Sequence, residues 1–248
     1  MAHAVSCVAS HRRYDNNRLP PATGYRSMDS RSKETQVVSK QRVADHGEVY
    51  TGAREVNAML DLVRPETERI DSRFLEPACG TGNFLIEILR RKLAVVASRY
   101  GRSQLEFERY GVLAVSSLYG IDILIDNVRE CRGRLFDEFD ERYTGRFRKK
   151  AKDECRDAVR YILERNIIHG DALTLKQVGD DAPPIVFSEW SLARGSMMKR
   201  RDFTFKELLS RPDTKELALF AGQERDVFIP TPVKEYPLIH FLRVVEVG

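Results

Sequence analysis

The sequence lacks several features, and each absence excludes a class of protein. The 248-residue chain has no run of about 18 or more consecutive apolar residues, which argues against a membrane-spanning helix. Its first residues contain neither a basic run nor an apolar core, so we expect no secretory signal. The four cysteines are scattered without a C-x-x-C pair. A disulfide framework or a structural zinc site is therefore disfavoured, and a reducing cytoplasm fits.

An excess of charge of one sign is also absent from most of the chain. The net charge is +4, and residues 1–45 hold 8 basic and 4 acidic residues, so the remainder balances at 33 against 33. A neutral body gives only a weak argument for nucleic-acid binding. Local basic runs occur at 146–152 and 199–201. They are typical of a solvated surface, and a patch that contacts phosphate groups is the alternative.

Patterning divides the chain into three parts. Residues 1–45 are polar, contain Pro20 and Pro21 and show no hydrophobic period, which predicts a disordered basic tail. Apolar residues then recur at helical spacing in 54–64, 83–100, 105–116, 125–143 and 153–165. Short apolar runs alternate with these segments at 74–75, 118–122, 167–169 and 185–187. The alternation predicts an α/β domain over 46–205, with an open, mostly parallel sheet and helices on both faces. Residues 206–248 form a C-terminal extension, expected to be an edge strand or a docking tail.

A glycine loop lies between the predicted strand at 74–75 and the helix at 83–100. Gly80 and Gly82 allow a sharp turn and a close approach to a ligand, and the helix start offers free amides. The loop lacks the G-x-x-x-x-G-K-[ST] and G-x-G-x-x-G patterns, which argues against a triphosphate or a dinucleotide. Glu76 would repel a pyrophosphate. It would favour a cationic ligand such as the amino group or sulfonium of S-adenosylmethionine.

The string from Glu76 to Phe84, EPACGTGNF, resembles motif I of the amino-methylating DNA methyltransferases, the adenine-N6 branch in particular. Residues 47–52 resemble the G-x-[FY]-x-T-P element that closes over the methionine end of the cofactor. Residues 119–123 resemble motif II, with Asp122 as the acid that binds the ribose hydroxyls. Residues 168–173 resemble motif III, with Asp171 near the adenine. The resemblance implies a Rossmann-like class I methyltransferase fold and S-adenosyl-L-methionine as cofactor.

The same resemblance implies a set of cofactor-binding residues drawn from these four segments. They are Tyr50, Thr51, Glu76, Pro77, Ala78, Cys79, Gly80, Gly82, Asn83, Phe84, Asp122, Ile123, Asp171 and Ala172. No metal site is expected.

The family's catalytic motif IV, [DNS]-P-P-[YFW], has no clear counterpart. The strand expected at 185–187 is followed by Ser188, Glu189 and Trp190, and the proline pair precedes it. If these three residues form a variant catalytic site, Glu189 accepts the amino hydrogens of the flipped adenine and Trp190 stacks on its ring. The alternative is that Trp190, the only tryptophan, is a core or interface residue.

The function expected from this resemblance is that of a modification subunit. The chain would be an S-adenosylmethionine-dependent DNA adenine-N6 methyltransferase, or its cofactor-binding subunit, in a restriction–modification system. A catalytically incomplete scaffold subunit of a defence complex is the alternative, and a methyltransferase for RNA, protein or a small molecule is a third. Only 58 residues follow Trp190, too few for a sizeable recognition domain. We therefore expect a separate recognition or restriction subunit, weak and salt-dependent DNA binding, no membrane association and a cytoplasmic location.

Overall fold

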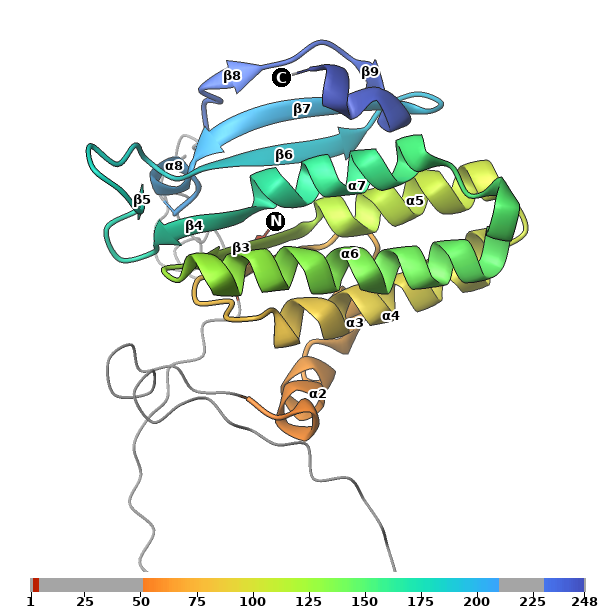
Figure 1. The fold of residues 1–248 in the computed structure, drawn as a ribbon, viewed down its shortest axis with the longest axis horizontal. Coiled ribbons are helices and arrows are strands. Elements are labelled where there is room, and N and C mark those ends of the chain that lie inside the picture. The colour runs from red at the N-terminus through yellow and green to blue at the C-terminus, as the bar shows by residue number, and fades with distance from the viewer. Residues whose placement is uncertain (1, 5–50, 210–229, 248) are drawn as a thin grey trace, which may run out of the picture. The chain divides into compact units, whose positions relative to one another are not determined.

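The computed structural model describes residues 2–4, 51–209 and 230–247 (Figure 1). The predicted tail, apart from residues 2–4, lies outside the described residues. So do Tyr50 and the rest of the 47–50 element. None of the described helices is long and apolar enough to cross a membrane.

The helices expected from the hydrophobic period are present. They are α2 (Ala53–Asp61), α4 (Asn83–Tyr100), α5 (Gln104–Ser116), α6 (Ile125–Phe147) and α7 (Asp153–Asn166), with a short α3 (Arg64–Thr67) after α2. Ser103 starts α5 because its hydroxyl accepts a hydrogen bond from the Glu106 amide at 3.4 Å. Helix α6 extends four residues past the predicted end and is followed by the short helix η1 (Arg148–Lys150).

The strands between these helices form a mostly parallel sheet. Its order is β1 (Ala2–Ala4), β2 (Arg73–Glu76), β3 (Leu118–Asp122), β4 (Ile167–Asp171) and β5 (Lys176–Gln177). The first four strands are parallel and β5 is antiparallel to β4. Strand β3 is buried along its whole length, as expected for a strand inside a parallel sheet. The prediction of a mixed α/β fold with a mostly parallel sheet is confirmed.

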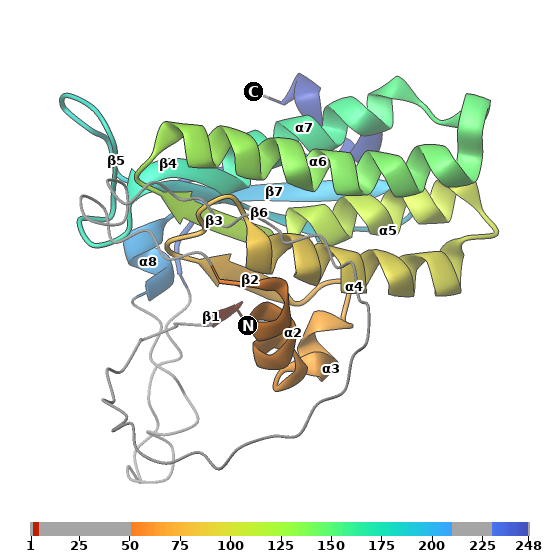
Figure 2. The ribbon, with the colours of Figure 1, turned by 60° about the horizontal axis from the view of Figure 1, so that its bottom comes forward.

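One face of this sheet is covered by helices. Phe74 of β2 and Leu118 of β3 belong to the same buried cluster as Leu89 of α4 and Val128 of α6. Helices α5 and α7 end directly before β3 and β4, so they lie at the amino ends of these strands. There they pack against the parts of α4 and α6 that extend beyond the sheet (Figures 1 and 2).

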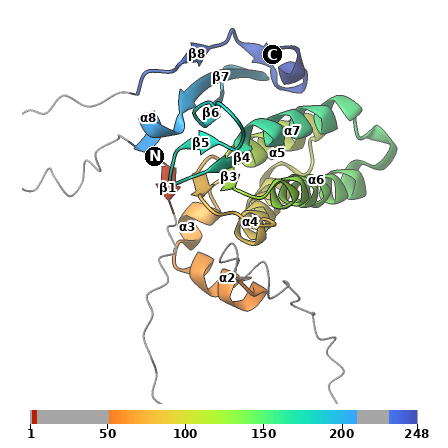
Figure 3. The ribbon, with the colours of Figure 1, turned by 60° about the vertical axis from the view of Figure 1, so that its left-hand side comes forward.

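The opposite face differs from the expectation of helices on both faces. It is covered by a second, antiparallel sheet and the short helix α8 (Phe205–Leu209) (Figures 1 and 3). Ile185, Phe187 and Phe205 pack there against Tyr119 and Ile121 of β3. The expectation is wrong for this face because the predicted fourth parallel strand forms an antiparallel hairpin instead.

The second sheet also takes in the end of the described chain. Its strands are β6 (Val186–Leu192), β7 (Met197–Thr204), β8 (Lys234–Glu235) and β9 (Ile239–His240). Both β8 and β9 pair with β7, and the 3-10 helix η2 (Phe241–Glu246) packs on α7. Residues 230–247 therefore lie on the core as short edge strands and a cap.

Candidate ligand-binding site

The glycine loop connects Glu76, the last residue of β2, to Asn83, the first residue of α4. Gly80 and Gly82 both have positive φ angles, 51° and 88°. A Cβ atom at Gly82 would lie 2.6 Å from the Cys131 sulfur, so this glycine is needed for packing against α6. A Cβ atom at Gly80 would meet nothing within 4 Å. The loop is therefore closely packed behind Gly82 and open in front of Gly80.

Two carboxylates flank this open backbone. Asp122, at the end of β3, accepts hydrogen bonds from the Gly80 amide at 2.8 Å and the Leu124 amide at 2.9 Å. The Oδ1 atom, which accepts from Leu124, also accepts from the Asn127 side-chain amide at 3.2 Å. Asp122 thus joins the loop, the end of β3 and the start of α6.

Glu76 has no such partner. Its Oε2 atom is buried and forms no hydrogen bond with any described residue. Burial, and the nearby negative charge of Asp122, raise the pKa of the Glu76 carboxyl to about 8. Buried polar atoms in proteins almost always have a partner, so an orphaned carboxylate oxygen at a strand end indicates a missing proton or cation.

Arg134 of α6 fixes the far side of the loop. Its Nη1 atom donates to the Thr81 carbonyl at 2.7 Å, the Thr81 hydroxyl at 2.8 Å and the Asn83 side-chain oxygen at 3.0 Å. The Asn83 side-chain amide donates in turn to the Thr51 carbonyl at 3.2 Å. Thr51 and Asn83, both expected site residues, are therefore in contact.

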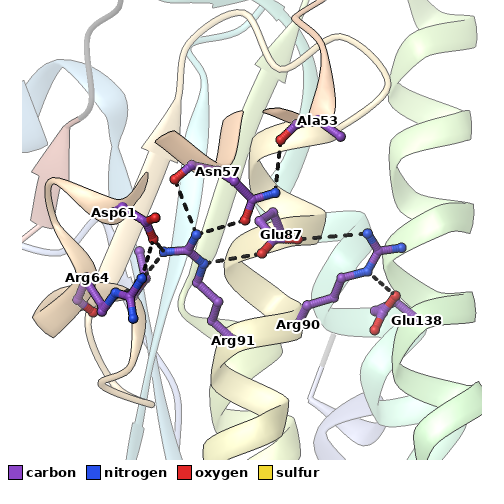
Figure 4. Close-up of polar contacts among 9 residues, drawn as sticks. Ala53, Asn57, Asp61, Arg64, Glu87, Arg90, Arg91 and Glu138 are labelled. Atoms are coloured by element: carbon purple, nitrogen blue, oxygen red, sulfur yellow. Dashed lines mark hydrogen bonds and ion pairs between the residues drawn. The ribbon is translucent and has the colours of Figure 1, made fainter. Parts of the chain in front are cut away.

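Helix α2, which follows Thr51, is held on α4 by Arg91 (Figure 4). The guanidinium donates to the Asn57 side-chain oxygen at 2.9 Å and pairs with Asp61 at 3.0 Å and with Glu87 at 3.3 Å. Asn57 donates to the Ala53 carbonyl at 2.9 Å. This network places the start of α2 beside the glycine loop.

The ends of β3 and β4 continue the site along the sheet edge. Ile123 follows Asp122 and is 51% exposed, and its carbonyl lies 2.9 Å from the His169 Nε2 atom of β4. Asp171 accepts from the Leu173 amide at 2.8 Å, which shapes the turn after β4. Ala172 packs with the apolar cluster on the second face.

The remaining expected residues have packing or turn roles. Pro77 and Ala78 form the turn after β2. The Cys79 amide donates to the Ile121 carbonyl at 2.9 Å, and its thiol is buried. Phe84 packs against the main core cluster. These residues hold the loop in place from behind.

The predicted position of Ser188, Glu189 and Trp190 is wrong. They lie inside β6, which pairs in antiparallel fashion with β7, rather than beyond the carboxyl end of a fourth parallel strand. Beside β2 lies β1. Ser188 donates to Asp202 at 2.7 Å. All three side chains are buried and paired within the second sheet and its surroundings.

Their contacts place Glu189 and Trp190 at the amino ends of the parallel strands, whereas the glycine loop lies at the carboxyl ends. Glu189 pairs at 2.9 Å with Arg73, the first residue of β2, whereas the loop follows its last residue. Trp190 is 3% exposed, and its Nε1 atom donates at 3.4 Å to Asn166, which immediately precedes β4. Neither side chain reaches the site described above.

Sequence reasoning missed Arg134 and Asn127, which the fold brings to the loop from α6. They lie more than 40 residues from Gly80, and a lone arginine or asparagine on a predicted helix carries no motif signal. Among the described residues, no group of three or more His, Cys, Asp or Glu side chains could hold a metal ion.

No protein-family model, curated protein or solved structure matches the chain at significant similarity.

Replacing Arg134 by Ala tests the fixation of the loop. The change removes three hydrogen bonds, each worth about 0.5–1.5 kcal/mol. We expect the amides of residues 80–86 to exchange with solvent on the order of tenfold faster, as measured by hydrogen-exchange mass spectrometry. Arg129→Ala, an exposed position on the same helix, is the control and leaves exchange unchanged. Equal exchange in the two variants would show that Arg134 does not hold the loop.

Replacing Trp190 by Ala tests its assignment to the core. Because the side chain is buried against Tyr161 and Asn166, we expect a loss of about 3–5 kcal/mol in the free energy of unfolding. Urea unfolding followed by circular dichroism measures it. Trp190→Phe retains a ring and costs less. A stability unchanged by Trp190→Ala would contradict the buried position.

Proposed function

We propose that the loop between β2 and α4 binds S-adenosylmethionine, and that the chain is the cofactor-binding subunit of a DNA adenine-N6 methyltransferase of the restriction–modification type. The observation that carries the proposal is the buried Glu76 oxygen without a hydrogen-bond partner among the described residues, near Asp122 and at the start of the loop whose backbone is open at Gly80. The motif resemblance to the methyltransferases supports the choice of ligand.

The donor set fits this cofactor. S-adenosylmethionine carries an ammonium and a sulfonium, and a buried carboxylate beside a second carboxylate favours such cations. The hydroxyls of the ribose suit Asp122 as hydrogen-bond donors. The hydrogen bonds that Asp122 accepts within the described residues come from neutral amides and not from a cation. Exposed Ile123 offers an apolar surface to the adenine, next to the turn at Asp171. When bound, the cofactor supplies the methyl group.

The described residues support cofactor binding better than complete catalysis. Ser188, Glu189 and Trp190 lie in β6 with their own partners. Base binding then has to come from a partner subunit or from residues outside the described ranges. The second candidate function, a cofactor-binding scaffold without methyl transfer, is favoured by this same observation.

Glu76 makes the pH dependence of cofactor binding a direct test. With a pKa of about 8, the free carboxyl is mostly protonated at pH 7. A cationic ligand requires the ionised form, so affinity for S-adenosylmethionine should rise by up to about tenfold per pH unit between pH 6 and 8. Above pH 8 the ligand's amino group, with a pKa of about 7.7–8.0, loses its charge and the rise ends. Isothermal titration calorimetry measures the profile.

Glu76→Gln is the matched variant because it keeps the shape and removes the titrating group. We expect weaker binding and no rise between pH 6 and 8. A wild-type affinity that is flat with pH, or a Gln variant with the same profile, would refute the assignment of Glu76. Absence of binding by the folded protein at every pH would refute the proposed cofactor.

A methylation assay separates the subunit from the scaffold. The chain is co-expressed with the products of neighbouring genes, and N6-methyladenine in previously unmodified DNA is measured by mass spectrometry. We expect methylation only with a partner that contributes base binding and target recognition, and its loss with Asp122→Ala. Intact cofactor binding without methylation in every partner context would establish the scaffold.

A further inference from the structure

We infer that a second surface, at the end of the helical layer remote from the glycine loop, binds the phosphate backbone of DNA. It is formed by the turn between α4 and α5 and the turn between α6 and α7, which lie together at one end of the helices (Figures 1 and 2). This distal basic surface consists of six exposed cationic residues: Arg99, Arg102, Arg146, Arg148, Lys149 and Lys150.

The two turns form one continuous surface. The Arg146 Nη1 atom donates to the Gly101 carbonyl at 3.3 Å, and the Gln104 side chain donates to the Lys150 carbonyl at 2.6 Å. Within the second turn, the Arg148 amide donates to Thr144 and its carbonyl accepts from Ala151. Three consecutive cations are therefore displayed on a fixed backbone, which lowers the conformational entropy lost on binding.

The cations of this surface are not neutralised by the protein. Two neighbouring cations are neutralised: Lys152 pairs with Glu108 at 3.1 Å, and Arg156 pairs with Asp140 at 2.6 Å. None of the six cations of the distal basic surface forms an ion pair with a carboxylate in the described ranges. Exposed acids nearby, Glu141, Asp153 and Glu154, are fewer than the six cations, so the surface keeps a net positive charge.

The distance between the distal basic surface and the glycine loop is within the reach of one short DNA duplex. Helix α6 starts next to Asp122 and ends at this surface, and its 23 residues span about 34 Å. That length corresponds to about ten base pairs of B-DNA. A duplex held at the strand edge and running along α6 would reach this surface, which would then add phosphate contacts outside the target site. This step depends on the proposed function, because it takes DNA as the substrate.

The experiment measures binding of the full chain to a 30-base-pair duplex by fluorescence anisotropy at several salt concentrations, without S-adenosylmethionine. The test variant is Arg102→Ala/Lys149→Ala/Lys150→Ala, whose three side chains are exposed. We expect the slope of log affinity against log salt to fall by about 2–3 and the affinity at 0.1 M salt to fall on the order of a hundredfold.

Two control variants make the test specific. Arg194→Ala/Lys234→Ala/Arg243→Ala removes the same charge from exposed residues of the β6–β7 turn, β8 and η2, away from both the strand edge and the distal basic surface. Arg102→Lys/Lys149→Arg/Lys150→Arg keeps the charge on the distal surface. We expect the second control to bind like the wild type and the first to lose less than the test variant.

The inference is overturned if the test variant keeps the wild-type affinity and salt slope, or if the first control loses as much as the test variant. Calorimetry with S-adenosylmethionine is run on the same proteins, and the test variant should bind it unchanged. A failure of cofactor binding leaves the DNA measurement valid, so the two proposals fail separately.

Discussion

The hydrogen bond from the Gly80 amide to the Asp122 carboxylate is the contact on which the candidate site depends. It joins the glycine loop to the end of β3, and through Leu124 and Asn127 the same carboxylate fixes the start of α6. Gly82 then has to be glycine, because α6 brings Cys131 against it. A strand end, two helices and a loop are thus held in one arrangement, and Arg134 fixes its outer side. These contacts restrain the backbone at Gly80, and the space beside it stays open.

In the same arrangement a second carboxylate, Glu76, has one buried oxygen without a hydrogen-bond partner among the described residues. A buried acid beside another acid destabilises the ionised protein, which raises its pKa to about 8. Such a cost is expected where a ligand completes the site. By contrast, the acid and base groups around β6 are fully paired, as Glu189 with Arg73 and Arg201 illustrates. The difference between an orphaned and a satisfied carboxylate is the physical reason for proposing the ligand site at the glycine loop.

Much of this was predictable from the sequence, and the failures have identifiable causes. The period of apolar residues located α4, α5, α6 and α7 to within a few residues, and the glycines located the loop, because these are local signals. The placement of residues 185–190 failed because a short apolar run is the same in a parallel and an antiparallel strand. Pairing is decided by distant residues, here the whole of β7. Arg134 was missed for the same reason, since only the packing of α6 on α4 brings it to Thr81.

The central claim is that Glu76 is protonated in the free protein and releases its proton to the solvent when a cationic ligand binds beside it. Isothermal titration calorimetry with S-adenosylmethionine at pH 7, in two buffers of different ionisation enthalpy, counts the protons exchanged on binding. The account predicts a net release on the order of one proton per cofactor bound, because a carboxyl with a pKa of about 8 is mostly protonated in the free protein. Binding without proton release, or no binding by the folded chain, would contradict it.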